Sequence, residues 1–342
     1  MNIANSNIDL YHSYPKVDLH RHLEGALRIE TMREIAGSHS IPVPGSLNEL
    51  VQVQDSDPFT FQNFLAKFNT LRLFYRSPDV IDRITREAVE DAALDNVSHL
   101  ELRFTPVALS RAERFPLHDV MNWVTDSARE AAERLKIKVG LIASVNRHES
   151  LELAEQVAWL AAEHMNNGVV GMDMAGNEAE FSAKPFIGVI KEAHQAGLHI
   201  TIHAGEWAGA QNVREAIEEF GAERIGHGVR VMEDDYTIAL AKERGTAFEV
   251  CVTSNYQTGV LPANQKHPLQ SMLDAGLNVT INTDDPSVSR ITLSHEYRVV
   301  RDDLGITEAA LKGCIVAAAQ ASFLAEKDKK ELVRSVQKEL KI

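Results

Sequence analysis

The sequence contains few of the residues that mark secreted, membrane-spanning or fibrous proteins. Its 342 residues include only two cysteines, Cys251 and Cys314, and these form no CxxC pair. Two free thiols in a chain of this length suggest a reducing compartment. No hydrophobic run approaches the roughly 18 residues that a membrane-spanning helix needs, and the polar N-terminus does not resemble a signal peptide. We therefore expect a cytoplasmic protein with no membrane partner.

Positive charge is also scarce. The chain has 35 Lys and Arg against 49 Asp and Glu, which gives a formal net charge of −14. An acidic surface repels phosphate backbones, so we expect no nucleic-acid partner. The same average argues weakly against a highly anionic substrate, unless a local basic patch overrides it. The sequence does not indicate the oligomeric state.

No linker, low-complexity segment or fixed-period repeat divides the chain, and we expect residues 1–342 to form one domain. Short, nearly continuous apolar runs alternate with longer amphipathic stretches. Such runs are typical of strands buried on both faces of a parallel sheet. Alternating β and α units favour a (β/α)8 TIM barrel, with a doubly wound open sheet as the alternative. The eight predicted strands are Lys16–His20, His99–Phe104, Val139–Ser144, Val169–Met174, His199–His203, Glu223–Gly226, Ala247–Val252 and Asn278–Asn282.

Between these runs the residue spacing is helical. Two segments exceed a minimal barrel. Residues 30–95 include a helix-like stretch with Phe59, Phe61, Phe64, Leu65 and Phe68, and the tail after about residue 306 predicts two further helices. The predicted helices outside the first segment are Ser127–Leu135, Leu151–His164, Lys184–Gln195, Gln211–Phe220, Glu308–Leu324 and Lys327–Leu340.

Histidine and aspartate residues follow several of the predicted strands. His20 and His22 are two positions apart, so on a strand both imidazoles point to one face and can bind one ion. His203 ends the fifth predicted strand, and Asp284 follows the eighth. In a TIM barrel the C-terminal strand ends meet at one face. His20, His22, His203 and Asp284 are therefore a predicted zinc site with one ion per chain, although each residue alone has an ordinary structural explanation.

Three more polar residues lie beside these candidates. His227, between two glycines, is either a fourth imidazole ligand or a residue that orients a metal-activated hydroxide. Glu206 follows His203 by three positions and can move protons as a general acid and base. Asp285, next to Asp284, can hold a substrate ring nitrogen. The thiolate pattern HxE with PCxxC, typical of one class of zinc deaminases, is absent.

Six strings along the chain resemble the adenosine/adenine deaminase family of the metal-dependent hydrolase superfamily, and are closest to adenosine deaminase. The resemblance extends from about residue 14 to residue 325 and implies a decorated (β/α)8 barrel that binds one zinc ion. The strings are Lys16–Gly25, Met172–Glu178, His203–Glu206, Arg224–Gly228, Cys251–Asn255 and Asn282–Pro286.

The resemblance also implies roles for individual residues. Glu206 corresponds to the acid/base that protonates purine N1, and His227 to the residue that orients the attacking hydroxide. Asp285 corresponds to the contact with N7, and the backbone N–H of Gly176 to the donor to N3. His22 is also expected to contact the substrate. The Phe-rich helix resembles an apolar lid over the ribose side of the pocket.

Glu24 departs from the pattern, since adenosine deaminases usually have Asp there. The string HLEG is more frequent in relatives that act on free adenine or aminodeoxyfutalosine, whereas Ile225 to Gly228 and Glu206 to Gly209 favour the nucleoside branch. We therefore expect deamination of adenosine and 2′-deoxyadenosine in purine salvage, with adenine or aminodeoxyfutalosine as alternative substrates. Trp207 either forms part of the pocket wall or packs against the barrel rim, and we favour packing.

Two readings from other classes remain. The first is an amidase or lactonase with two metal ions on the same scaffold, but no lysine ends a predicted strand where a bridging carboxylated lysine would stand. The second is a purine-binding or zinc-binding regulatory protein without catalysis, which would not require the full set of catalytic side chains.

Overall fold

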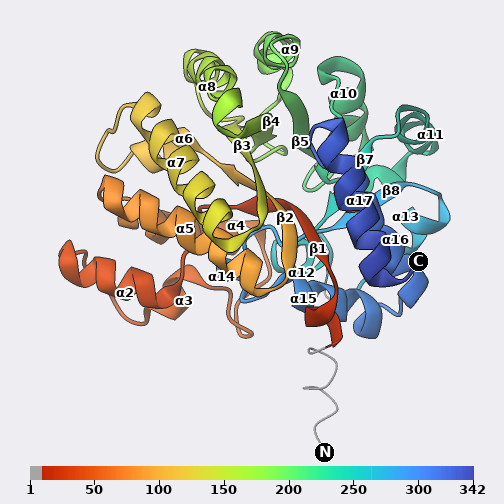
Figure 1. Cartoon of the computed structure of the whole chain (residues 1–342), viewed down its shortest axis with the longest axis horizontal. Coiled ribbons are helices and arrows are strands. Elements are labelled where there is room, and N and C mark those ends of the chain that lie inside the picture. The colour runs from red at the N-terminus through yellow and green to blue at the C-terminus, as the bar shows by residue number, and fades with distance from the viewer. Residues whose placement is uncertain (1–9, 263) are drawn as a thin grey trace, which may run out of the picture.

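The computed structural model describes residues 10–262 and 264–342, and it contains eight parallel strands in one sheet. Neighbours along the chain are neighbours in the sheet, in the order β1 to β8, and helices surround the strands (Figure 1). This arrangement confirms the predicted (β/α)8 barrel and excludes the open doubly wound sheet. The strands are β1 (Lys16–His22), β2 (Val97–Phe104), β3 (Lys138–Asn146), β4 (Val169–Ala175), β5 (His199–Ala204), β6 (Arg224–His227), β7 (Ala247–Val250) and β8 (Asn278–Ile281).

The barrel closes between its last and first strands just beyond the end of β8. Asp284 donates its backbone N–H to the carbonyl of His20 over 2.7 Å, and its own carbonyl accepts the N–H of His22 over 2.8 Å. The eighth strand was predicted to end at Asn282, just before Asp284, and β8 ends one residue earlier, at Ile281. The three-residue extension places Asp284 directly against β1.

Helices from α5 (Pro78–Leu94) onward surround the strands as the outer ring of the barrel. Ser77 begins α5 by accepting a hydrogen bond from the N–H of Val80, and Pro78 occupies the first turn, where its missing N–H costs nothing. The predicted helix from Lys184 starts instead with a 3-10 turn, Lys184–Phe186. The main helices are α5 (Pro78–Leu94), α6 (Pro106–Ser110), α7 (Leu117–Leu135), α8 (Leu151–Glu163), α9 (Ile187–Gln195), α10 (Ala210–Phe220), α11 (Asp235–Arg244), α12 (Val252–Gln257), α13 (Leu269–Asp274), α14 (Pro286–Ser289), α15 (Leu293–Arg298), α16 (Glu308–Ala321) and α17 (Glu326–Leu340).

Two additions decorate the barrel, as the sequence predicted. The segment between β1 and β2 contains α2 (Ile29–Ser38), α3 (Leu47–Val51) and α4 (Phe61–Leu71) before α5. The tail forms α16 and α17, which pack against each other beside β8 (Figure 1). No helix in the described ranges is long and apolar enough to cross a membrane.

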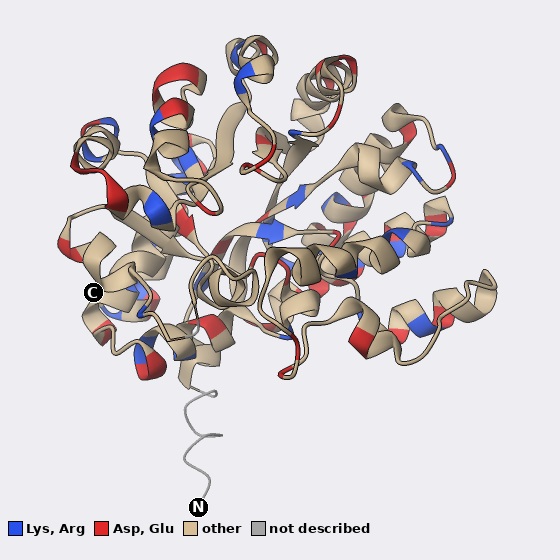
Figure 2. Cartoon of the chain, turned by 180° about the vertical axis from the view of Figure 1, so that it is seen from behind, with Lys and Arg blue, Asp and Glu red and all other residues tan. Residues whose placement is uncertain are grey.

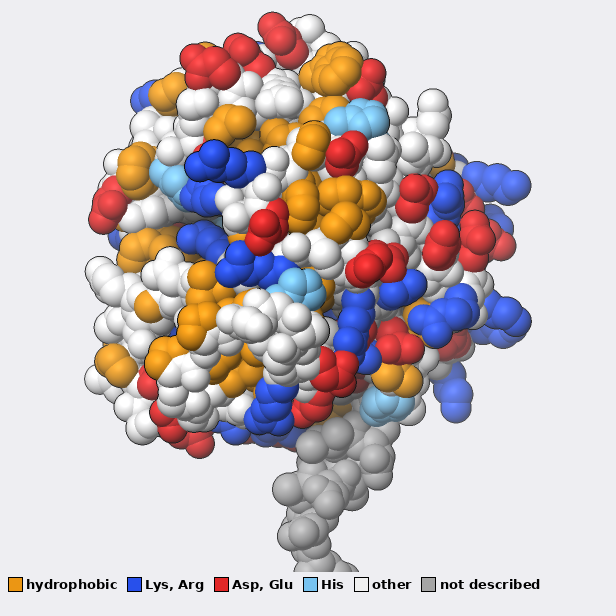
Figure 3. Space-filling view, turned by 90° about the vertical axis from the view of Figure 1, so that its left-hand side faces the viewer, with side chains coloured by type: hydrophobic (Ala, Val, Ile, Leu, Met, Phe, Trp, Pro, Cys, Tyr) orange, Lys and Arg blue, Asp and Glu red, His pale blue; other side chains and the backbone are white. Residues whose placement is uncertain are grey.

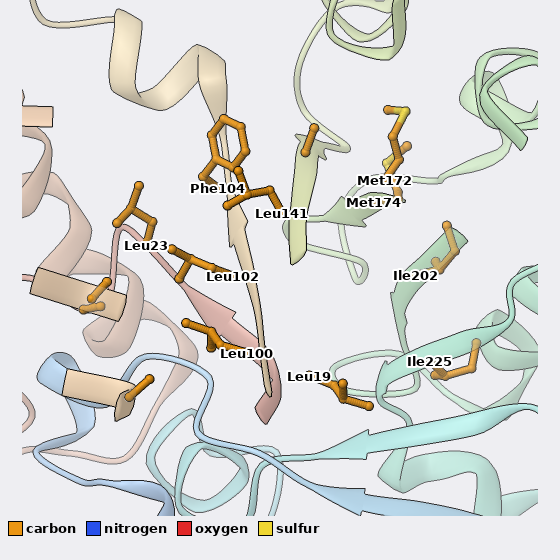
Figure 4. Packing of buried hydrophobic residues seen from close by; sticks show 14 of the residues in the cluster. Leu19, Leu23, Leu100, Leu102, Phe104, Leu141, Met172, Met174, Ile202 and Ile225 are labelled. Carbon is orange, nitrogen blue, oxygen red and sulfur yellow. The ribbon is translucent and has the colours of Figure 1, made fainter. Parts of the chain in front are cut away.

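The two faces of the strands differ in chemistry. On β2, the apolar side chains Leu100, Leu102 and Phe104 are fully buried, and Figure 4 shows them along the strand with apolar side chains of other strands nearby. The residues between them are polar. Arg103 donates to Glu249 of β7 over 2.7 Å, and Glu101 lies 2.6 Å from Arg224 of β6. Because β2 does not pair with β6 or β7, these polar side chains meet inside the barrel.

Charged side chains therefore occur both inside the barrel and on its surface. Figure 2 shows Lys, Arg, Asp and Glu on the central strands as well as on the outer helices. On the face shown in Figure 3, positive and negative side chains are interspersed, and several Lys and Arg lie together across its middle. The net negative charge of the chain is thus not spread evenly over this face.

Candidate active site

The predicted zinc ligands lie together where the strands end. His20 and His22 come from the end of β1, His203 from β5, and Asp284 follows β8. The Nε2 atoms of His22 and His203 are 3.4 Å apart. The Oδ1 atom of Asp284 is 3.3 Å from Nε2 of His20 and 3.5 Å from Nε2 of His22. Four side chains from three strands thus converge on one point.

The outer ring nitrogens of two histidines are engaged by buried carboxylates. Nδ1 of His20 is 2.8 Å from Glu249, and Nδ1 of His203 is 2.9 Å from Asp173. These contacts direct both Nε2 atoms towards the centre of the cluster, as carboxylate partners do for metal-binding histidines. Nε2 of His20 is buried and has no hydrogen-bond partner within the described residues. The donor set therefore fits a zinc ion, which prefers imidazole and carboxylate ligands.

Burial and local charge set the protonation of the ligands. Burial lowers the pKa of His22 well below its ordinary value, which favours the neutral imidazole. Burial alone would raise the pKa of Asp284, but the neighbouring His20 and His227 hold it well below its usual range. Neutral imidazole and ionised carboxylate are the forms that bind a metal.

The backbone at the site adopts uncommon conformations. His227 has φ of 59° and Asp284 has φ of 64°, in the left-handed region that non-glycine residues rarely occupy. Such conformations cluster at functional sites because the surrounding structure must hold them. Gly226 precedes His227, and a Cβ there would lie 3.0 Å from the ring of His20 and 3.2 Å from His203. The glycine thus leaves room for the two imidazoles.

Glu206 lies in the loop after β5, and its Oε2 is 3.7 Å from Nε2 of His227. A buried carboxylate, Glu178, holds this loop by accepting the backbone N–H groups of Gly205, Glu206 and Ala208 over 3.1, 2.6 and 2.8 Å. Burial raises the pKa of Glu206 well above its ordinary value, and the carboxylates of Asp284 and Glu178 add to the shift. The protonated form of Glu206 is therefore favoured.

Asp285 and Glu24 are two further buried acidic residues of the site, and the charge of Glu24 acts on Asp285. A Cβ on Gly25 would lie 1.8 Å from Oδ1 of Asp285, so only glycine fits there. Glu24 accepts the backbone N–H of Thr105 over 2.6 Å with one oxygen. Its other oxygen and Oδ1 of Asp285 are buried without a hydrogen-bond partner in the described part of the chain. Both atoms are available to a ligand.

A cavity is lined by most of the candidate catalytic and substrate-binding residues and by three of the four predicted zinc ligands, whereas His20 lies behind its wall. Phe64, Leu65 and Phe68 of α4 form its apolar side, in agreement with the predicted lid helix, whereas Phe59 precedes the helix. Trp207 both lines the cavity and packs edge-on against Phe61 of α4, with 3.8 Å between ring centroids. Trp207 thus forms part of the pocket wall, and its aromatic partner belongs to the lid helix and not to the barrel rim. The cavity is lined by His22, Glu24, Phe64, Leu65, Phe68, Arg72, Thr105, Ala108, Asn146, Ala175, Gly176, His203, Glu206, Trp207, His227, Thr258, Asp284 and Asp285.

Sequence reasoning missed several polar residues of the site. Asp173 and Glu249 are isolated acidic residues in apolar strands. Such a position indicates a buried carboxylate with a specific role, but the sequence does not show which side chain it contacts. Glu178 and Asn255 belong to strings that resemble the family, yet no role was inferred for them. His267 and Arg72 carry no signal in the sequence.

The chain also resembles proteins of known type. The family model described as adenosine deaminase matches residues 15–339. An adenosine deaminase of Shewanella denitrificans is 36% identical over 326 residues, which cover 94% of this chain and 97% of that protein. Because a family model matches most of the chain and this relative is matched over nearly its whole length, both findings bear on the entire barrel.

Solved structures of related enzymes are also similar to this chain. A zinc-bound amidohydrolase from Burkholderia ambifaria has a TM-score of 0.91 at 26% identity and covers 100% of this chain and 94% of its own. An Arabidopsis N6-mAMP deaminase has a TM-score of 0.86 at 29% identity, with 96% of this chain and 99% of its own covered. The barrel, the converging ligands and these similarities lead to one conclusion. This chain belongs to the adenosine deaminase family, a family of hydrolases that act on C–N bonds.

Proposed function

We propose that the chain hydrolyses adenosine and 2′-deoxyadenosine to inosine and 2′-deoxyinosine, with release of ammonia. The observation that carries the proposal is that His22, His203 and Asp284 of the predicted zinc cluster line one cavity together with the buried carboxyl of Glu206. His20, His22, His203 and Asp284 would hold one zinc ion. Zinc bound to such ligands lowers the pKa of a water and so supplies a nucleophile near neutral pH.

The proton transfers belong to Glu206. Its protonated carboxyl donates to N1 of the purine, which makes C6 electrophilic. The oxygen of water adds to C6 while the Glu206 carboxylate takes one proton from that water and passes it to the amino nitrogen. The C6–N bond then breaks, and the proton of the C6 hydroxyl returns to Glu206 as the C6=O bond forms. One water is consumed and one ammonia leaves. His227 supports the addition by donating a hydrogen bond from Nε2 to the attacking oxygen, where negative charge develops.

Other residues of the cavity would orient the substrate. Asp285 contacts N7, and the backbone N–H of Gly176 donates to N3. Glu24 and His22, which also line the cavity, would supply the remaining contacts to the substrate. The apolar side chains of α4 exclude water from the reacting atoms, which strengthens these polar contacts. The two buried free thiols agree with a reducing compartment, and we propose the cytoplasm as the location.

A substrate panel tests the proposal. Adenosine, 2′-deoxyadenosine, adenine and aminodeoxyfutalosine are offered to one zinc-loaded preparation, and loss of the amino group is followed by absorbance and by ammonia release. We expect the two nucleosides to have the highest kcat/KM. Faster turnover of adenine or aminodeoxyfutalosine would contradict the substrate assignment while leaving the chemistry intact.

A second candidate substrate is a purine nucleoside 5′-monophosphate. Arg72 lines the cavity, and its guanidinium forms no hydrogen bond or ion pair with any residue in the described ranges. It is also one of the charges that act on the buried Glu24. An unpaired guanidinium at a pocket is suited to bind a phosphate. The similar Arabidopsis protein is an N6-mAMP deaminase, which acts on a nucleotide.

Replacement of Arg72 separates the two candidates. If Arg72 binds a 5′-phosphate, Arg72→Gln should lower kcat/KM for AMP by about 10-fold or more, because one charge-assisted hydrogen bond contributes roughly 1.5–3 kcal/mol. Turnover of adenosine should change by less than about 3-fold. Steady-state kinetics with both substrates give the ratio. Equal losses for AMP and adenosine, or no turnover of AMP by the wild type, would remove the nucleotide candidate.

A further inference from the structure

A chain of hydrogen bonds connects the backbone of α13 to His227. The N–H of Leu269 lies 3.0 Å from Nδ1 of His267, and Nε2 of His267 lies 3.2 Å from Oδ1 of Asn255. The amide nitrogen of Asn255 is in turn 3.2 Å from Nδ1 of His227. All four residues are buried, so no solvent competes for these bonds.

The direction of every bond follows from its first member. A backbone N–H can only donate, so Nδ1 of His267 must accept. Burial lowers the pKa of His267 to about 3, and the ring is therefore neutral with its one proton on Nε2. Nε2 then donates to the oxygen of Asn255. Rotating the amide of Asn255 by half a turn would set two donors against each other, so its NH2 group faces His227.

The last bond determines the tautomer of His227. Its Nδ1 accepts from Asn255, so a neutral ring carries its proton on Nε2. Nε2 points into the site, 3.7 Å from Oε2 of Glu206 and 3.8 Å from Oδ2 of Asp284. A nitrogen that carries a proton cannot bind a metal, but it can donate a hydrogen bond.

The tautomer distinguishes two roles that the position of His227 alone leaves open, metal ligand and hydrogen-bond donor. His227 lies close enough to His20 and His203 for these three rings to bind one ion together. We propose that His267 and Asn255 are positioning residues that hold His227 as its Nε2–H tautomer. They thereby make His227 a hydrogen-bond donor to the attacking oxygen instead of a fourth imidazole ligand. The donor role rests on the proposed deaminase function, whereas the tautomer does not.

The substitution Asn255→Asp tests this chain of hydrogen bonds. A carboxylate can only accept a hydrogen bond, so a neutral His227 would carry its proton on Nδ1, and its Nε2 would be unprotonated. We expect kcat for adenosine to fall about 10²–10³-fold, as for loss of one donor to a developing oxyanion, with KM changed less than about 3-fold. His267→Leu removes the upstream bond but retains the amide, and should lower kcat about 10-fold.

A matched control exists elsewhere in the fold. Asn122 of α7 and His164, the residue after the end of α8, form another asparagine–histidine pair with 3.0 Å between Oδ1 and Nε2. Asn122→Asp makes the same chemical change without reaching the site, so its kcat should equal that of the wild type. If kcat of Asn122→Asp fell as far as that of Asn255→Asp, the loss would not be specific to the hydrogen bonds that reach His227, and the proposal would be overturned.

Ring nitrogen NMR of the zinc-loaded protein supplies a readout independent of activity. In histidine labelled with 15N, the wild-type signals assigned to His227 should show a protonated Nε2 and an unprotonated Nδ1, and Asn255→Asp should reverse them. His227→Gln identifies these signals and should retain one zinc per chain. A protonated Nδ1 in the wild type, or loss of zinc from His227→Gln, would overturn the proposal. If the NMR result agrees but adenosine is not turned over, the tautomer stands and the deaminase function fails.

Discussion

Glu206→Gln is expected to lower kcat for adenosine by about 10²–10⁴-fold, the usual range for loss of a general acid and base. The side-chain amide has nearly the size of the carboxyl, and the backbone N–H at this position still donates to Glu178, so the loop should keep its place. An amide cannot deliver a proton to N1 and recover one. Because Glu206 is not among the predicted ligands, the variant should still bind one zinc per chain.

Zinc analysis and single-turnover kinetics of the purified variant provide the measurement. Glu180→Gln is the matched control, since Glu180 is an exposed carboxylate two residues from Glu178 and outside the metal cluster. It should turn over adenosine at the wild-type rate. Normal activity of Glu206→Gln would refute the assignment of the acid and base, and loss of zinc would instead assign Glu206 to the metal.

The barrel could be predicted from sequence because each strand is a short apolar run with helical spacing on both sides. The eight runs all proved to be strands, with ends that differ by a few residues. Val252 was assigned to the seventh strand, but it begins α12, because a run of apolar residues does not reveal where strand geometry stops. Phe323 and Leu324 likewise lie beyond the end of α16.

The clustering of His20, His22, His203 and Asp284 was also accessible from sequence, because the fold alone brings the C-terminal ends of strands together. Their partners were not. The bond from Nδ1 of His20 to Glu249 links β1 to β7, and such contacts depend on which side chains meet inside the closed barrel. His267 lies in a loop before α13, and only the three-dimensional structure brings it to Asn255. Sequence spacing therefore indicated the predicted ligands, whereas the tautomer and the orientation of the rings could be inferred only from the three-dimensional structure.

The contact between Trp207 and the lid has the same origin. The sequence favoured packing of the indole against the barrel rim, because the string after His203 does not show which segment covers it. In the structure Trp207 lines both the candidate active-site cavity and a second cavity that Phe59 and Phe61 also line. An aromatic residue beside Glu206 can therefore both close the pocket and hold α4.

Glu249 is the residue whose loss should cost the most stability. It is fully buried and accepts from His20 over 2.8 Å, from Arg103 over 2.7 Å and from Arg224 over 2.6 Å. Glu249→Gln removes its charge and leaves two buried guanidinium groups with less compensation. Removing one member of a buried ion pair typically costs about 3–5 kcal/mol. We expect a loss of that size in the free energy of unfolding of the zinc-free protein.

The same change should weaken zinc binding, because His20 loses the carboxylate that orients its ring. Loss of such a partner usually lowers metal affinity about 10–100-fold. Urea unfolding without zinc gives the stability, and competition with a chelator gives the affinity. Glu233→Gln, which breaks the exposed pair with Arg230, is the control and should cost no more than about 1 kcal/mol. If Glu249→Gln lowers stability but leaves zinc affinity unchanged, Glu249 supports the barrel without orienting His20, and the contact over 2.8 Å has no influence on the metal site.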